Sequence, residues 1–139
     1  MNDLNGDLNL DNLDMDKLAA EAKDKWGDTE AFKQSEERVK KLGKFGMLKM
    51  AHESAKIMQG IVSRMNEGPK SEEVQKLIGR HYESLRNFYE PNLEMYRGLA
   101  NMYVNDERFR STHDKIAPGL AKFMHDAMIY YADSKSRNG

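Results

Sequence analysis

Apolar residues recur every three or four positions along most of this chain, which places them on one face of an α-helix. Met47, Met50, Ile57, Ile61 and Met65 lie on one such stripe. No run alternates apolar and polar residues in the way that a half-buried β-strand does. The pattern therefore predicts an all-α protein.

Prolines and capping residues divide this pattern into helices. Pro91 and Pro118 interrupt any long heptad repeat, which argues against a coiled coil. Ser71, Asn92 and Asp106 have side chains that can cap helix N-termini, and Pro118 suits the first turn of the last helix. We expect about seven helices, joined by short connections into one compact domain.

Residues 1–14 consist almost entirely of Asn, Asp, Leu and Gly, and we expect them to form a flexible tail. Asp3, Asn5 and Asp7 resemble the start of a calcium-binding loop. Leu8 and Asp14, however, stand where such a loop needs glycine and glutamate. The domain itself is expected to cover residues 15–135.

The two helices expected within residues 15–42 carry few apolar anchors. Leu18, Ala22 and Trp26 recur at four-residue spacing in the first helix. Asp28 or Thr29 can cap the second, whose face is mostly charged. These two helices are not expected to be stable by themselves.

Composition excludes several classes of function. The 139 residues include no cysteine, so disulfides, thiolate metal sites and cysteine nucleophiles are absent. The formal net charge is −1, which gives no general field for nucleic acid, so we expect no direct nucleic-acid contact. No segment has the apolar length of a membrane span or the pattern of a signal peptide, and we expect a cytoplasmic protein without membrane contact.

The four histidines do not form a recognisable catalytic or metal site. His52 could begin a zinc-protease helix motif, which needs a second histidine ligand four positions later. That position holds Lys56, which rules the motif out. His81 and His113 lie on apolar faces, where a satisfied core or pocket-rim histidine is the favoured interpretation and haem ligation the alternative. We expect no enzyme activity, no metal and no cofactor.

Four tyrosines are spaced seven residues apart: Tyr82, Tyr89, Tyr96 and Tyr103. Pro91 separates the first two from the last two, so they fall on two neighbouring helices. They can face a shared crevice suited to a large planar ligand, because tyrosine offers both a ring and a hydroxyl. The alternative is that they lie at the edges of the core with their hydroxyls in water.

Two longer stretches resemble a known family. The first is residues 25–35, KWGDTEAFKQS. The second comprises FYEP at 88–91, EMYRGLANMYV at 94–104, DERF at 106–109, DKIAPGLA at 114–121 and DAM at 126–128. Over about residues 18–133 the chain resembles the TipAS domain, the antibiotic-recognition domain at the C-terminus of MerR-type regulators.

This resemblance implies a globin-like helical fold without haem and a cleft for bulky, rigid natural products such as thiopeptides or albicidin. It also implies that the N-terminal helices, here residues 15–42, form a mobile lid over the ligand. The expected function is drug sequestration or, attached to a DNA-binding segment, effector sensing. The expected oligomeric state is a monomer or a weak homodimer.

The chain departs from the family at two places. Some thiopeptide-binding members carry a cysteine just after the Phe-Tyr-acid step and capture the antibiotic covalently, but that position aligns with Pro91. We therefore predict reversible binding. The stretch Gly43–Met47 replaces the serine and aromatic residue that often open the third helix, which changes one wall of the cleft.

We place the ligand between residues 80–89 and 92–104. The expected cleft walls and lid contacts are His81, Leu85, Phe88, Tyr89, Met95, Tyr96, Leu99 and Tyr103, with Trp26 and Phe32 from the lid. A helical module that receives a partner helix in the same crevice is the alternative from another functional class.

Overall fold

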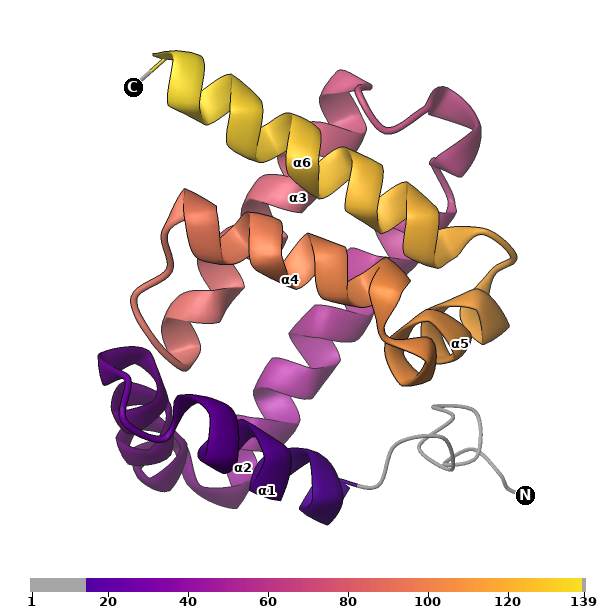
Figure 1. Ribbon diagram of the computed structural model, residues 1–139. Helices are drawn as coiled ribbons and strands as arrows, with labels where there is room; N and C mark the ends of the chain where they lie inside the picture. Colours follow the sequence, from indigo (N-terminus) through magenta and orange to yellow (C-terminus); the bar gives the residue numbers. More distant parts are fainter. Residues whose placement is uncertain (1–14, 139) are drawn as a thin grey trace, which may run out of the picture.

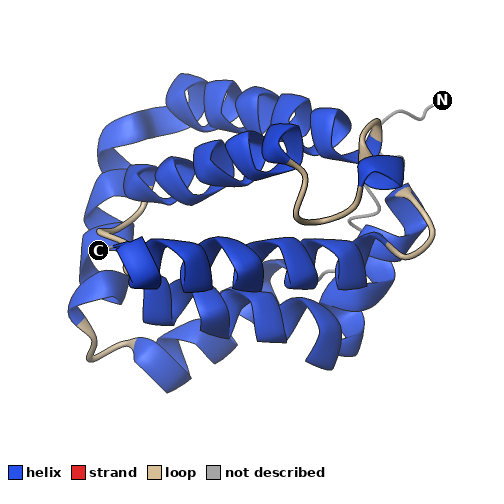
Figure 2. Ribbon diagram, turned by 90° about the horizontal axis from the view of Figure 1, so that it is seen from above, coloured by secondary structure: helices blue, strands red, loops and turns tan. Residues whose placement is uncertain are grey.

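The computed structural model describes residues 15–138 as helices joined by short loops, and this part of the chain contains no strand (Figure 1, Figure 2). Its elements are α1 (Met15–Trp26), α2 (Glu30–Val62), η3 (Met65–Glu67), α3 (Glu72–Ser84), η4 (Leu85–Asn87), α4 (Leu93–Asn105), α5 (Glu107–Ile116) and α6 (Leu120–Asn138). The all-α prediction is confirmed. The expected tail, residues 1–14, lies outside the described residues. None of the described helices is long and apolar enough to cross a membrane.

The helix N-termini follow from the capping residues in the sequence. Each cap accepts a hydrogen bond from a backbone N–H in the first turn, which satisfies one otherwise unpaired donor. The pairs are Thr29 with Phe32, Ser71 with Val74, Asn92 with Met95, and Asp106 with Arg108. The start of α6 differs from the prediction: Pro118 precedes the helix, and the carboxylate of Asp114 accepts from the Ala121 N–H at 3.0 Å.

The long helix α2 replaces two expected helices. Gly43 interrupts it with φ 67° and ψ −175°, a conformation that is almost restricted to glycine. The boundary expected between residues 42 and 47 is therefore a kink inside one helix. With this kink the described residues form seven α-helical segments, besides the short 3-10 helices η3 and η4, and about seven helices were expected from the sequence.

The core lies between α4 and α6, which make the most extensive contact, and α3 and the end of α2 close it. Tyr96, Ala100, Met124 and Met128 have no exposed surface. Of the predicted α2 stripe, Ile57 and Ile61 are buried, whereas Met47 is 36% exposed and Met50 is half-buried. The stripe therefore reaches the core only from Ile57 onwards.

The first two helical segments stand apart from this core. In Figure 1, α1 and the part of α2 before Gly43 form a hairpin at the bottom of the molecule, and α3 to α6 lie above it. We call residues 15–42 the hairpin and residues 57–138 the body. Among the described side chains, none before Ile57 is buried. The weak anchoring predicted for these helices is confirmed.

Candidate functional site

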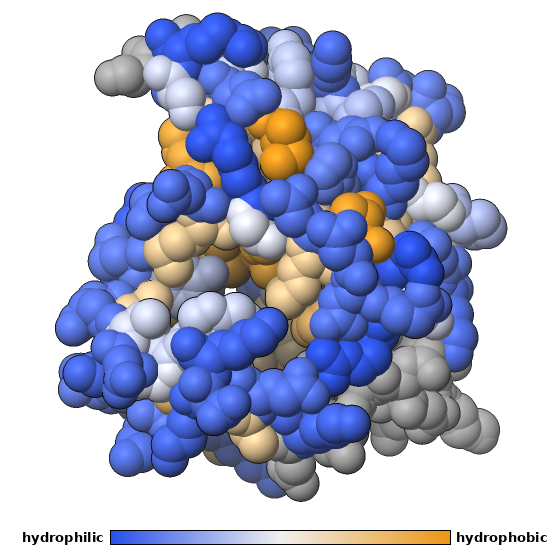
Figure 3. Space-filling model, viewed as in Figure 1, coloured by the Kyte–Doolittle hydropathy of each residue, from blue (hydrophilic) through white to orange (hydrophobic). Residues whose placement is uncertain are grey.

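The front of the molecule is hollowed between the hairpin and α4, and the surrounding side chains have moderate hydropathy (Figure 3). A cavity of about 290 Å³ lies between α2 and the segment formed by the end of α3 and η4. Its lining residues are Leu42, Gly46, Lys49, Met50, Glu53 and Ser54 on α2, with Ser84, Asn87 and Phe88 opposite. The site therefore lies beside the end of the hairpin: Leu42 is its last residue, and the other α2 lining residues follow the Gly43 kink and face the body.

The α2 wall of this cavity was not among the predicted site residues. Of its members, Met50 lies on the apolar stripe found in the sequence. Spacing alone does not separate a cavity wall from a core face, because both recur with the same helical period. The sequence feature that could have indicated this wall is the glycine pair Gly43 and Gly46. It falls in the stretch where the chain departs from the family. Gly46 packs against Leu42, so that a Cβ there would lie 2.9 Å from the Leu42 Cβ.

Of the predicted wall residues, Phe88 lines the cavity, where it is half-buried just after η4. Leu85 and Leu99 instead pack against the core. Met95 is half-buried on α4, and Tyr89 is half-buried in the loop before it. Burial raises the pKa of Tyr89, and the Tyr82 hydroxyl adds to this effect. Tyr89 therefore stays neutral and can donate a hydrogen bond.

The other predicted wall residues form a buried cluster around His81. Its Nδ1 lies 2.7 Å from the Tyr96 hydroxyl and its Nε2 lies 3.4 Å from the Tyr103 hydroxyl. The rings of Tyr82 and Tyr96 meet edge-to-face at 5.0 Å, and the His113 ring lies 4.4 Å from that of Tyr103. The two helices thus bring these tyrosines together as the spacing predicted.

This cluster corrects the interpretation of the tyrosine series as an open crevice. Tyr96 has no exposed surface, and Tyr82 and Tyr103 are 8% and 9% exposed. The alternative with hydroxyls in water is also wrong for Tyr96 and Tyr103, because their hydroxyls bond to His81. In this conformation the three tyrosines belong to the core and do not line the cavity.

Electrostatics keep this cluster uncharged. Burial, with a smaller contribution from the nearby His113, lowers the pKa of His81 to about 4. Burial raises the pKa of Tyr103 to about 12 and that of Tyr96 still more. The cluster therefore contributes hydrogen bonds and ring contacts. Haem ligation by His81 is disfavoured, because both ring nitrogens already have tyrosine partners.

The predicted lid residues lie on the hairpin, at its turn. Trp26 ends α1 and is 47% exposed, with the Lys25 ammonium 5.5 Å from its ring centroid. Phe32 is half-buried in the first turn of α2. Neither side chain lines the cavity in this conformation, so their contact with a ligand stays a prediction.

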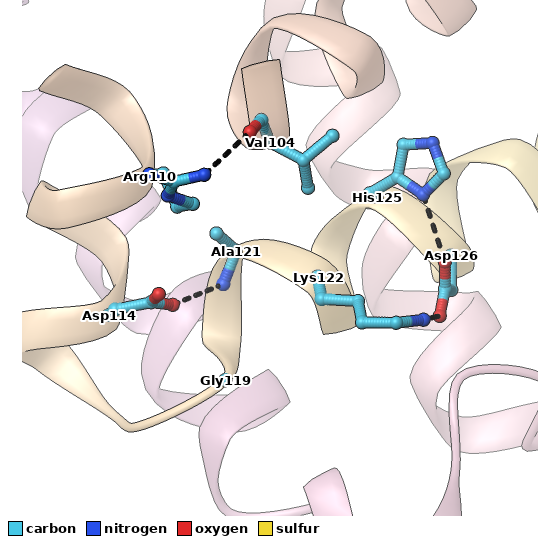
Figure 4. A pocket seen from close by; sticks show the side chains of 8 residues that line it. All are labelled: Val104, Arg110, Asp114, Gly119, Ala121, Lys122, His125 and Asp126. Atoms are coloured by element: carbon cyan, nitrogen blue, oxygen red, sulfur yellow. Dashed lines mark hydrogen bonds and ion pairs between the residues drawn. The ribbon is translucent and has the colours of Figure 1, made fainter. Parts of the chain in front are cut away.

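A second cavity, of about 370 Å³, lies on the other side of the body between α5 and α6 (Figure 4). Its charged side chains already have partners. Asp126 accepts from Lys122 at 2.7 Å and contacts His125 at 2.9 Å. Arg110 points to the Val104 carbonyl, and Asp114 caps α6. No predicted site residue lies here, and no lining charge is left to bind a ligand.

Comparison with known proteins identifies relatives of this chain. It is 32% identical over 120 residues to the HTH-type transcriptional activator TipA of Streptomyces coelicolor, a match that covers 84% of this chain and 47% of TipA. It is 35% identical over 78 residues to the HTH-type transcriptional activator mta of Bacillus subtilis, covering 55% of this chain and 30% of mta. The chain thus spans about half the length of TipA.

A solved structure shares the fold. The structure of nosiheptide in complex with TipAS, from a thiopeptide antibiotic multidrug resistance system of Streptomyces lividans, superimposes with a TM-score of 0.80 at 29% sequence identity. The match covers 92% of this chain and 94% of that one. The family model of the TipAS antibiotic-recognition domain matches residues 18–131. The chain therefore belongs to the TipAS antibiotic-recognition domain family.

Proposed function

We propose that this chain reversibly binds a bulky, rigid antibiotic of the thiopeptide kind between the hairpin and the body, without catalysing a reaction. The observation that carries this proposal is the cavity between α2 and η4, at the junction of the hairpin and the body. The similarity to a nosiheptide-bound TipAS structure over 92% of the chain supports the choice of ligand class.

The lining residues suit a planar ligand of mixed polarity. Phe88, Met50 and Leu42 offer apolar contact, and Ser84 and Asn87 offer hydrogen-bonding groups. The present volume of about 290 Å³ is small for a bulky antibiotic. Entry of such a ligand therefore requires the cavity to widen. Leu42 is the lining residue that belongs to the hairpin, and α2 can bend at the adjacent Gly43, so movement of the hairpin opens this end of the cavity.

The wider role follows from the relatives. TipA and mta are HTH-type transcriptional activators. This chain matches about half of TipA and a smaller part of mta. We propose that the chain is the effector-sensing part of such a regulator, or sequesters the drug when it acts alone. In either role it works in the cytoplasm, and another protein segment contacts DNA.

Titration of the purified chain with nosiheptide tests the proposal. We expect saturable one-to-one heat release and a change in the fluorescence of Trp26, the only tryptophan. Phe88→Ala removes a cavity wall and should weaken binding about tenfold, because a buried aromatic contact is lost. Phe45→Ala is the matched control, since Phe45 is 87% exposed and does not line the cavity. No saturation with nosiheptide or any member of a thiopeptide panel would contradict the proposal.

Mass spectrometry tests the reversibility. The chain has no cysteine, and Pro91 stands where some relatives have one. Under denaturing conditions the complex should release unmodified protein with the mass of the chain alone. A retained antibiotic adduct would show that another nucleophile captures the ligand.

A further inference from the structure

The hairpin is attached to the body by polar contacts at two separate points. At the first, Arg108 of α5 donates to both carboxylate oxygens of Glu21 on α1, at 3.0 Å each. Arg108 is itself oriented by Asp106, which accepts from it at 2.8 Å and 3.1 Å. A two-pronged pair of this kind fixes orientation as well as distance.

At the second point, α2 meets the loop after η4. The guanidinium of Arg38 donates to the Arg86 carbonyl oxygen at 2.7 Å and to the Glu90 carboxylate at 3.3 Å. The side-chain oxygen of Gln34 accepts from the Glu90 N–H at 2.9 Å. Both sides of the Glu90 residue, backbone and carboxylate, are therefore bound to the hairpin.

Apolar packing is weak among the described residues of the hairpin. No described side chain of the hairpin is buried: Trp26 is 47% exposed and Phe32 is half-buried. The body, in contrast, is held by side chains with no exposed surface. The position of the hairpin over the cavity therefore depends on the two polar contacts and on the connection through Gly43.

We propose that the Glu21–Arg108 pair and the Arg38–Glu90 pair are two latches that hold the hairpin closed and set how long a ligand stays bound. This inference rests on the proposed function and names its regulation. None of the four residues lines the cavity. They act on the ligand through the position of the hairpin, and not by contact.

The latches are partly exposed, which makes them weak and sensitive to salt. The side chains of Arg108 and Glu21 are 35% and 43% exposed, and those of Arg38 and Glu90 are 32% and 57% exposed. Exposed pairs are screened at physiological ionic strength. The hairpin can therefore open without unfolding the body, as entry of a bulky ligand requires.

Single substitutions in the full chain test this. Glu21→Gln and Arg38→Gln each remove a charge from one latch. The matched control is Glu37→Gln, which breaks the pair of Glu37 with Lys41, 3.8 Å away on the same helix. Amide hydrogen exchange without ligand reports opening of the hairpin, and the dissociation rate of nosiheptide reports its effect on binding.

We expect each latch variant to raise exchange in residues 15–42 about two- to fivefold and to speed nosiheptide dissociation by a similar factor. Exchange in α4 and α6 should not change, and Glu37→Gln should behave as the unmodified chain. Raising the salt concentration should bring the exchange and dissociation rates of the unmodified chain closer to those of the variants. Unchanged exchange and dissociation in both latch variants, or equal changes in Glu37→Gln, would overturn the proposal.

The two measurements separate this inference from the proposed function. If the unmodified chain does not bind nosiheptide, the proposed ligand class fails. The exchange measurement still decides whether the two pairs hold the hairpin, since it needs no ligand. The double variant Glu21→Gln/Arg38→Gln should show the fastest hydrogen exchange in residues 15–42. If exchange in the double variant is no faster than in the unmodified chain, the latch proposal is again overturned.

Discussion

The hairpin and the body of this protein are held in place by different kinds of interaction. The body buries Tyr96, Met124 and Met128 completely, so its helices share one apolar core. The hairpin buries no described side chain and contacts the body through Glu21, Arg38 and their partners. Apolar burial is strong and is not weakened by charge screening, whereas exposed ion pairs are weak and screened.

This difference explains how one small domain can be both stable and open to a ligand. Segments with few buried apolar contacts open at low free-energy cost, while the core opens only on global unfolding. The cavity lies at the border between the two. A ligand there meets residues of the body on the η4 side and, on α2, a wall that begins at Leu42, next to the kink at Gly43.

The largest expected difference between the two regions concerns side-chain truncation. Met124→Ala leaves a cavity in the core and should lower the free energy of unfolding by about 2–5 kcal/mol. Phe32→Ala in the hairpin should lower it by less than about 1 kcal/mol, since this residue is only half-buried. Urea denaturation followed by circular dichroism measures both. Equal losses would mean that the hairpin belongs to the core.

Acid should destabilise the body through His81. Its pKa is about 4 in the folded chain and about 6.5 when unperturbed, so between these values the unfolded chain binds a proton that the folded chain does not. The contribution of His81 to the free energy of unfolding should therefore be fully present above pH 6.5. It should be lost as the pH drops towards 4, by up to about 3 kcal/mol in all. Urea midpoints across this range measure the slope.

The matched variants for this pH effect are His81→Gln and His52→Gln. His81→Gln should remove the part of the slope between pH 6.5 and 4 that His81 causes. His52 is exposed on α2, and its replacement should leave the slope unchanged. A slope that survives in His81→Gln would assign the acid sensitivity to other groups.

Two glycines sharpen the comparison at the level of the backbone. Gly43→Ala forces a side chain into a conformation with φ 67° and ψ −175°, at a cost of about 1–3 kcal/mol, and should shift the hairpin away from its closed position. Gly98→Ala, in exposed helical backbone of α4 with nothing within 4 Å of the new Cβ, should stabilise the chain by about 0.5–1 kcal/mol. Thermal unfolding and hydrogen exchange of residues 15–42 distinguish the two variants. The same direction of change in both would contradict a special role for Gly43.

Helix caps provide the smallest and most local test. Ser71→Ala removes the cap of α3 in the body and should lower the free energy of global unfolding by about 1 kcal/mol. Thr29→Ala removes the cap of α2 in the hairpin and should raise exchange there with little effect on the global transition. If Thr29→Ala lowers global stability as much as Ser71→Ala, hairpin and body unfold together.

Much of the fold follows from local sequence rules. Thr29, Ser71, Asn92 and Asp106 cap helices as expected, because a cap needs only its own side chain and the next turn of backbone. Gly43 was correctly expected to mark a boundary. The order of segments is thus encoded over short distances along the chain.

The candidate site was less predictable, since it depends on which helical face meets which neighbour. The spacing of Tyr82, Tyr96 and Tyr103 indicated that they meet, but not that a central His81 would bind two of their hydroxyls in the core. Met50 shares its spacing with Ile57, yet one lines a cavity and the other is buried. Periodicity identifies an apolar face without identifying what covers it.

The sequence by itself determined the helical class, most helix ends, the absence of a cysteine nucleophile and the resemblance that gives the family. The tertiary structure decided which apolar faces are covered and how the hairpin is held. Glu21 and Arg108 are 87 positions apart, and Arg38 and Glu90 are 52 apart. No local rule pairs residues at such separations, because only the packing of the intervening helices brings their charges within hydrogen-bonding distance.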